Sequence, residues 1–306
     1  MGRADVEIST GIALGRTRAK MDANGKNISI AMRIDSHQHF WKYHPVKDAW
    51  ITDDMKLIQR DFGPADLLPL LHENNIDGSV AVQADQSEDE TIFLLSFAEK
   101  NDSIKGVVGW VDLQAVNAEE RLDHFSQYRK LKGLRHVVQA EPQDDFLLNK
   151  KFCSGIEKLA KYNFTYDILI FPKHFPYAIK FIQRFPQQAF VIDHLAKPNF
   201  KKADFFEWEK GIRGIAAYPN VFCKVSGMVT EADWANWKET DFTYCLDVVT
   251  EAFGITRLMF GSDWPVCLVA ASYQETSNII HRYYTQFSIQ EQAKIWGQNA
   301  IDFYHL

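Results

Sequence analysis

Cysteine is scarce in this chain of 306 residues, and long apolar stretches are missing. The four cysteines, at positions 153, 223, 245 and 267, form no C-x-x-C pair and fit no zinc-ribbon spacing. We therefore expect free thiols in a reducing, cytoplasmic compartment rather than a disulfide framework. No run of about 18 apolar residues occurs, so the sequence predicts no transmembrane helix and no membrane partner.

Blocks of like charge are missing as well. The chain has 34 basic and 40 acidic residues, a net charge of −6, and no basic stripe of the kind that binds nucleic acid. Nucleic acid is therefore not an expected partner, and a metal-dependent nuclease is disfavoured. We expect a small-molecule substrate and either a monomer or a homodimer.

The first 31 residues differ in character from the rest of the chain. They are polar and contain no continuous apolar core, so they make a poor secretory signal peptide. We predict that residues 1–31 are an extension, disordered or non-native. Residues 32–306 have no internal boundary rich in proline, glycine or serine, and we predict that they form one domain.

Eight short apolar runs recur through residues 32–306, and segments with apolar residues at helical spacing lie between them. The runs are nearly continuous in apolar character, which is typical of strands buried on both faces of a parallel sheet. The runs are residues 33–39, 78–83, 105–111, 133–138, 164–170, 189–194, 220–226 and 257–263. The helical segments are residues 64–74, 88–100, 118–129, 149–162, 176–184, 204–217, 242–253 and 271–284.

This alternation predicts an α/β fold of the (β/α)₈, or TIM, barrel type. An open, doubly wound sheet is the competing architecture, but it usually carries a glycine-rich fingerprint after its first strand. Residues 35–41 instead read D-S-H-Q-H-F-W. Active sites of TIM barrels lie at the C-terminal ends of the strands, so the residues at those ends form the candidate site.

Polar and ionisable residues do stand at these strand ends. His37 and His39 are two positions apart on the first strand, so both side chains can point to the same side. Such a pair is common by chance, but burying many polar groups at apolar strand ends is costly unless they serve one site. The accompanying residues are Gln83, Arg135, His136, Asp167, His194, Lys224 and Asp263.

Three motifs make a family resemblance specific. They are D-S-H-Q-H-F-W at 35–41, D-H-L-A-K-P at 193–198 and G-S-D-W-P at 261–265. Together they resemble the second amidohydrolase family, and within it the sugar-lactonase group of L-fuconolactonase-like and L-rhamnonolactonase-like proteins. The resemblance covers residues 32–306. It implies the amidohydrolase type of barrel and a hydrolase that opens a small sugar lactone by water attack on its ester bond.

The resemblance also implies roles for the strand-end residues. His37, His39, His194 and Asp263 would be catalytic, with Asp263 taking a proton from water, and they would hold one divalent ion, zinc first, if any is bound. Binuclear relatives need a carboxylated lysine at the end of the fourth strand, where this chain has Arg135 and His136, so two ions are not expected. The substrate would contact Gln83, Arg135, His136, Asp167, Lys224 and Trp264.

Three alternative functions stay open at this level. A metal-dependent nonoxidative decarboxylase would use a similar His and Asp site on a carboxylated ring, and carbon dioxide release would distinguish it. A pyrone dicarboxylate lactonase is a related branch. A catalytically silent barrel that binds sugar acids is disfavoured, because His37, His39, His194 and Asp263 are all present.

Overall fold

The computed structural model describes residues 19–21, 27–29 and 31–306. Most of the predicted extension, residues 1–31, lies outside the described residues, so its disorder or non-native origin stays a prediction. The two described segments within it, β1 (Ala19–Met21) and β2 (Asn27–Ser29), pair as a small antiparallel sheet separate from the main sheet.

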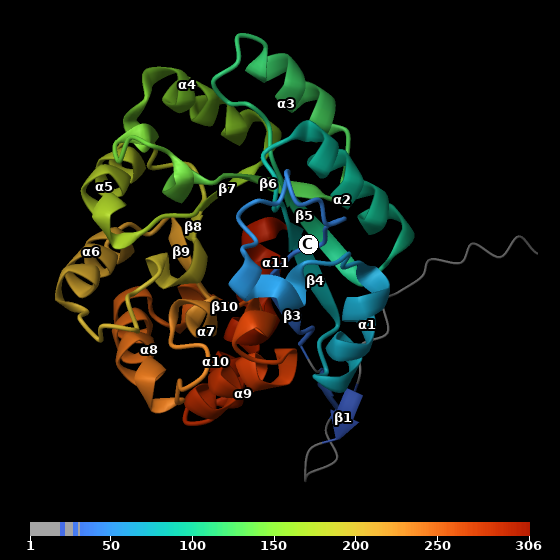
Figure 1. The fold of residues 1–306 in the computed structure, drawn as a ribbon, viewed down its shortest axis with the longest axis vertical. Helices are drawn as coiled ribbons and strands as arrows, with labels where there is room; N and C mark the ends of the chain where they lie inside the picture. The colour runs from blue at the N-terminus through green and yellow to red at the C-terminus, as the bar shows by residue number, and fades with distance from the viewer. Residues whose placement is uncertain (1–18, 22–26, 30) are drawn as a thin grey trace, which may run out of the picture.

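The main sheet has eight parallel strands in sequence order, one for each predicted apolar run, although the strands at 104–109 and 131–136 begin one and two residues before their runs. The ends of the sheet meet where the Asp263 N–H donates to the His37 carbonyl at 2.8 Å and the His39 N–H donates to the Trp264 carbonyl at 2.7 Å. This contact closes the sheet into the predicted barrel (Figure 1). The strands are β3 (Ile34–Gln38), β4 (Gly78–Val82), β5 (Ile104–Gly109), β6 (Leu131–His136), β7 (Thr165–Ile168), β8 (Phe190–Ile192), β9 (Val221–Val225) and β10 (Leu258–Phe260).

In the described residues, eight helices surround the barrel, and each corresponds to one predicted helical segment. The helices at 175–184 and 240–253 begin one and two residues before the predicted start. Side-chain caps set where some of them begin. The Ser87 hydroxyl accepts the Glu90 N–H at the start of α2 (Glu88–Lys100), and Ser272 with Glu275 forms a capping box at the start of α9 (Tyr273–Tyr284). No helix of the described residues is long and apolar enough to cross a membrane. The ring consists of α1 (Pro64–Glu73), α2 (Glu88–Lys100), α3 (Ala118–Ser126), α4 (Lys150–Leu159), α5 (Phe175–Arg184), α6 (Phe206–Ala216), α8 (Thr240–Phe253) and α9 (Tyr273–Tyr284).

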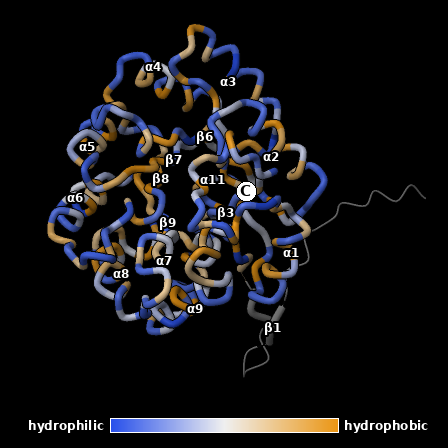
Figure 2. The backbone as a smooth tube through the Cα atoms, in the orientation of Figure 1, coloured by the Kyte–Doolittle hydropathy of each residue, from blue (hydrophilic) through white to orange (hydrophobic). Residues whose placement is uncertain are grey.

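Two apolar layers fill the molecule. The larger lies between strands and helices and contains residues such as Leu134, Ile192 and Phe260. The smaller contains strand residues whose side chains point into the barrel instead of toward the helices. Among them are Val80, Val108, Val191 and Met259. In Figure 2 the helices of the ring alternate between hydrophobic and hydrophilic residues, as expected for segments that bury one face only.

The last helix closes one end of the barrel. Two short helices in the chain's last segment were not predicted, α10 (Ile289–Ala293) and α11 (Asn299–Tyr304), and a π-helical turn (Lys294–Gln298) joins them. Phe303 and Tyr304 of α11 pack into the interior apolar layer. The Lys132 ammonium, near the start of β6, donates to the His305 carbonyl at 2.8 Å, so the plug lies at the N-terminal ends of the strands. The opposite, C-terminal end is left for the site.

We expect Phe303→Ala to destabilise the protein strongly, because the ring is buried against Phe222 and Tyr304 at centroid distances of 4.9 and 4.8 Å. Removing a buried phenylalanine ring costs about 3–5 kcal/mol of unfolding free energy. Urea unfolding followed by circular dichroism measures this. The matched control is Phe206→Ala, which removes a 72% exposed ring and should change stability by less than about 0.5 kcal/mol. Equal effects of the two variants would show that α11 is not a structural plug.

Candidate active site

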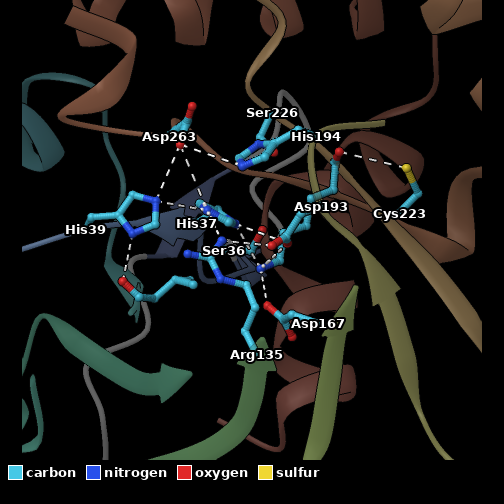
Figure 3. A network of polar contacts seen from close by, with 12 residues as sticks. Ser36, His37, His39, Arg135, Asp167, Asp193, His194, Cys223, Ser226 and Asp263 are labelled. Carbon is cyan, nitrogen blue, oxygen red and sulfur yellow. Dashed lines mark hydrogen bonds and ion pairs between the residues drawn. The ribbon is translucent and has the colours of Figure 1, made fainter. Parts of the chain in front are cut away.

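Four side chains meet at the C-terminal end of the barrel: His37, His39, His194 and Asp263. The Nε2 atoms of His37 and His39 are 3.1 Å apart. One carboxylate oxygen of Asp263, Oδ1, lies 3.5 Å from His39 Nε2, 3.9 Å from His37 Nε2 and 3.8 Å from His194 Nε2. Figure 3 shows this carboxylate facing the three imidazole rings. The structure therefore brings together the four residues that the sequence places in one catalytic set.

β3 positions the first two histidines. The spacing of two residues turns both rings to the same side, and His39 lies one residue beyond the end of the strand. The Nδ1 atom of His39 is 2.7 Å from the Val82 carbonyl oxygen. Because a carbonyl only accepts, this nitrogen carries the proton, and a neutral His39 ring therefore presents an unprotonated Nε2 to the site.

His194 is carried by an unusual backbone turn. β8 ends at Ile192, two residues earlier than the predicted run, and the four residues from His194 to Lys197 all have left-handed φ angles between 53° and 55°. Left-handed conformations cost non-glycine residues roughly 1–2 kcal/mol each. Local contacts oppose this strain, since the Trp208 indole N–H donates to the Leu195 carbonyl at 2.7 Å and the Ser226 hydroxyl lies 2.9 Å from His194 Nδ1.

Asp263 lies three residues beyond the end of β10, also with a positive φ, of 58°. Its backbone N–H bond to His37 and the Thr230 hydroxyl, 3.3 Å from its second carboxylate oxygen, fix its orientation. Below it, the buried Asp35 carboxylate accepts the Ser262 N–H at 2.9 Å and the Tyr273 hydroxyl at 3.0 Å. Burial raises the pKa of Asp35 to about 6 in spite of these hydrogen bonds. Asp35 therefore ties the strand that carries the histidines to the loop that carries Asp263.

A buried charge network supports His37 from the barrel interior. The Lys224 ammonium contacts Asp167, Asp193 Oδ1 at 3.0 Å and His37 Nδ1 at 3.0 Å. The Arg135 guanidinium pairs with the other oxygen of Asp193 at 3.0 Å. All four charged side chains are buried, and such charges are tolerated only when each is paired.

Three further predicted substrate contacts have different surroundings. The Gln83 side chain lies against Arg135, donating to its carbonyl at 3.1 Å. His136 follows Arg135 on β6 and so points to the other side, where its ring bonds Glu141 at 2.7 Å, accepts from the Trp110 indole at 3.2 Å and stacks on Phe146. The Trp264 ring is buried against Phe40 and Phe62. Substrate contact by any of the six predicted residues stays a prediction.

Sequence reasoning gave no role to Asp193 or Tyr304. Asp193 precedes His194, and neighbours on a strand point to opposite sides, so regular alternation places only one of them in the site. The left-handed turn breaks that alternation and lets both face His37. Tyr304 comes from α11, and its hydroxyl lies 2.9 Å from both carboxylate oxygens of Asp167. Its only local signal is its place in an apolar C-terminal segment.

The electrostatics keep two histidines neutral. Burial, and then the Lys224 ammonium, hold the pKa of His37 well below its usual value. Burial lowers the pKa of His194 to about 4, although the Asp263 carboxylate opposes this shift. Burial raises the pKa of Asp263, but the facing His194, His39 and His37 lower it more, so its pKa is below the usual value. At neutral pH the site thus combines an ionised Asp263 carboxylate with the neutral imidazoles of His37 and His194.

The carboxylates outnumber the cations in this network. Burial raises the pKa of Asp167 to about 6, against the effect of the Lys224 ammonium that pairs with it. Burial also raises the pKa of Asp193, but Lys224, His37 and Arg135 lower it well below its usual value. Two cations, Arg135 and Lys224, therefore face three carboxylates, Asp167, Asp193 and Asp263, an excess of one negative charge.

These residues fit a divalent metal ion. His37, His39 and Asp263 offer ligand atoms within 4.8 Å of one another, as do His37, Asp193 and His194. Ligand atoms around a tetrahedral zinc ion, at about 2.0–2.1 Å from it, are about 3.3 Å apart. The observed separations of 3.1 to 3.9 Å are close to this value. Neutral imidazoles and the excess negative charge both favour a cation here.

A parallel barrel with such a cluster at its C-terminal end defines a hydrolase of the amidohydrolase type. The chain belongs to the amidohydrolase family (Amidohydro_2), whose model matches residues 34–306. This confirms the resemblance drawn from the three motifs.

Two characterised relatives and one solved structure are similar over nearly the whole chain. The chain is 40% identical over 287 residues to an L-fucono-1,5-lactonase of Burkholderia multivorans, covering 90% of this chain and 97% of the relative. It is 32% identical, with the same coverage, to an L-fucono-1,5-lactonase of Burkholderia ambifaria. A crystal structure of an amidohydrolase from Burkholderia multivorans with bound zinc has a TM-score of 0.87 at 40% identity, covering 90% of this chain and all of that one.

We expect Gly227→Ala to weaken zinc binding. A Cβ atom on Gly227, whose φ is +67°, would lie 2.5 Å from His194 Nδ1, so the imidazole must move. Gly254→Ala is the matched control, because Gly254 has a φ of +66° but nothing within 4 Å of an added Cβ. Both variants should lose about 1 kcal/mol or more of stability from the left-handed backbone.

The measurement is calorimetric titration of chelator-treated protein with Zn²⁺, together with melting temperatures. The wild type should bind at most one ion per chain, and only Gly227→Ala should show a large loss of affinity. Equal zinc affinities in the two glycine variants would exclude His194 from the ligand set, and two tightly bound ions would contradict the one-metal arrangement.

Proposed function

We propose that this enzyme hydrolyses a small sugar lactone, an aldonolactone such as L-fuconolactone or L-rhamnonolactone, at the C-terminal end of its barrel. The observation that carries the proposal is the buried cluster of His37, His39, His194 and Asp263 in a chain 40% identical to an L-fucono-1,5-lactonase over 90% of its length. We also propose a cytoplasmic location, to which the four free cysteines conform, and a monomer or homodimer.

Asp263 is the proposed general base. Its carboxylate is ionised at neutral pH and is held by Thr230 through Oδ2, which leaves Oδ1 beside the imidazoles. It would accept a proton from the attacking water at the lactone carbonyl carbon. As the ring C–O bond breaks, the same carboxyl would return the proton to the leaving ring oxygen, so that the hydroxy acid forms without net consumption of a proton by the enzyme.

His37, His39, His194 and Asp263 would hold the metal ion, for which we propose zinc. Bound there, a divalent ion polarises the lactone carbonyl and lowers the pKa of water. The protein's own contribution is orientation: Val82 fixes the ring of His39, Ser226 that of His194, and Lys224 with Asp193 that of His37.

The pairing of the buried cations supports a neutral substrate. Arg135 is paired with Asp193, and Lys224 with Asp167 and Asp193, so neither guanidinium nor ammonium is free to neutralise a substrate carboxylate. A hydroxyl-rich lactone adds no charge, which favours an aldonolactone over a pyrone dicarboxylate.

Asp263→Asn should fold normally and lose kcat by roughly 10²–10⁴-fold, because the amide keeps the size of the side chain but cannot accept the proton. The measurement combines kcat on an aldonolactone with the melting temperature and zinc content of the same sample. If Asp263 only caps its loop, the melting temperature would fall while the kcat of the folded fraction survived. A folded, zinc-loaded variant with near-normal kcat would end the general-base assignment.

A pH-indicator screen of lactones, run with and without a chelator, tests the function itself. We expect turnover of five- or six-membered aldonolactones, loss of activity on chelation and recovery with Zn²⁺. Turnover of a pyrone dicarboxylate without turnover of any aldonolactone would reverse the substrate assignment. Release of carbon dioxide from a dihydroxybenzoate would assign a decarboxylase instead.

A further inference from the structure

A pocket of about 410 Å³ is lined by segments that follow strands of the barrel at their C-terminal ends, the end that carries the catalytic cluster. This volume is within the range of small-molecule sites, about 300–1,000 Å³. Its walls come from the segments that follow β7, β8 and β9, and include Phe171, Lys197, Asn199, Trp208 and Glu231. In Figure 1 these strands lie on the same side of the barrel as α6 and the short helix α7 (Met228–Glu231).

The pocket wall is joined to the catalytic residues through the backbone at two points. Lys197 is the last residue of the left-handed turn that begins at His194, and its N–H donates to the His194 carbonyl at 2.7 Å. Glu231 directly follows Thr230, whose hydroxyl contacts Asp263. Both wall segments therefore begin at the cluster, and a ring bound with its carbonyl at the cluster would direct its substituents toward this wall.

The residues of the pocket wall favour a ligand that carries hydroxyl groups and no carboxylate. The Lys197 ammonium pairs with Glu231 at 2.8 Å and lies 5.4 Å from the centroid of the Phe171 ring. Hydroxyl groups can accept from the ammonium and donate to the carboxylate without breaking the charge balance, and an aromatic face packs against the C–H face of a sugar ring. A carboxylated ligand would compete with Glu231 for Lys197. The wall also carries Lys201, Asp204 and Glu207, so its three carboxylates exceed its two ammonium groups by one charge.

We propose that this pocket recognises the hydroxyl groups of the lactone, with the Lys197–Glu231 pair as the specificity determinant. The proposal rests on the proposed lactonase function. It adds the residues by which the enzyme distinguishes a lactone with ring hydroxyl groups from one without them. Lys197 and Glu231 act in binding, and the proton transfers stay with Asp263.

Paired substrates test this proposal. A six-membered aldonolactone carries ring hydroxyl groups, whereas δ-valerolactone has the same ester ring without them. In Lys197→Met and Glu231→Gln, the ratio of kcat/KM for the aldonolactone to kcat/KM for δ-valerolactone should fall by about 10- to 100-fold, the effect expected for lost hydrogen bonds to charged groups. The fall should come mainly from a higher KM for the aldonolactone.

The control is Lys161→Met, which breaks an exposed ion pair with Glu119 of the same length, 2.8 Å, away from the pocket and should leave the ratio unchanged. Zinc content and melting temperature are measured for every variant. A proportional loss on both substrates would overturn the proposal, because the pair would then only brace the turn that carries His194. An unchanged ratio with wild-type rates would overturn it too, whereas a wild type inactive on both lactones would reject the lactonase function itself.

Discussion

The buried ion network between Asp167, Lys224, Asp193 and Arg135 is the constraint on which the rest of this site depends. It joins side chains from β6, β7, β9 and the turn after β8 inside the barrel, and it contacts His37 directly. Removing one partner from a buried pair costs several kcal/mol, because the remaining charge is left unpaired in a medium that solvates it poorly. The network therefore fixes the relative positions of the strands whose ends carry the clustered histidines and Asp263.

The network also divides the barrel into two halves. At the N-terminal ends of the strands the interior is filled by apolar side chains and by the plug of α11, and at the C-terminal ends it is charged. Tyr304 connects the halves, because its ring belongs to the apolar layer while its hydroxyl bonds Asp167. An apolar floor excludes water beneath the charges, which strengthens their mutual attraction and lowers the pKa of His37.

Backbone strain is concentrated at two residues of the cluster, just beyond the ends of their strands. His194 and Asp263 both have left-handed φ angles, and neither lies within a regular strand. Such conformations persist only where surrounding contacts oppose the strain. Trp208 and Ser226 do so around His194, and the closure of the barrel between Asp263 and His37 does so on the other side. The closing contact of the barrel is thus also the contact that aligns the proposed base with the histidines.

The amino-acid sequence determined the eight strands, the eight surrounding helices and the identity of the four clustered residues. It could do so because apolar periodicity reflects burial locally, and because His37, His39, His194 and Asp263 stand at or just beyond strand ends. It also excluded a bridging lysine, since Arg135 occupies that position. Tertiary structure alone decided which neighbours face the site: Asp193 turns inward with His194, His136 turns outward, and Tyr304 arrives from the far end of the chain. The physical reason is that left-handed turns, a plugged barrel floor and buried charge pairs each depend on contacts between residues distant in sequence, which local periodicity does not encode.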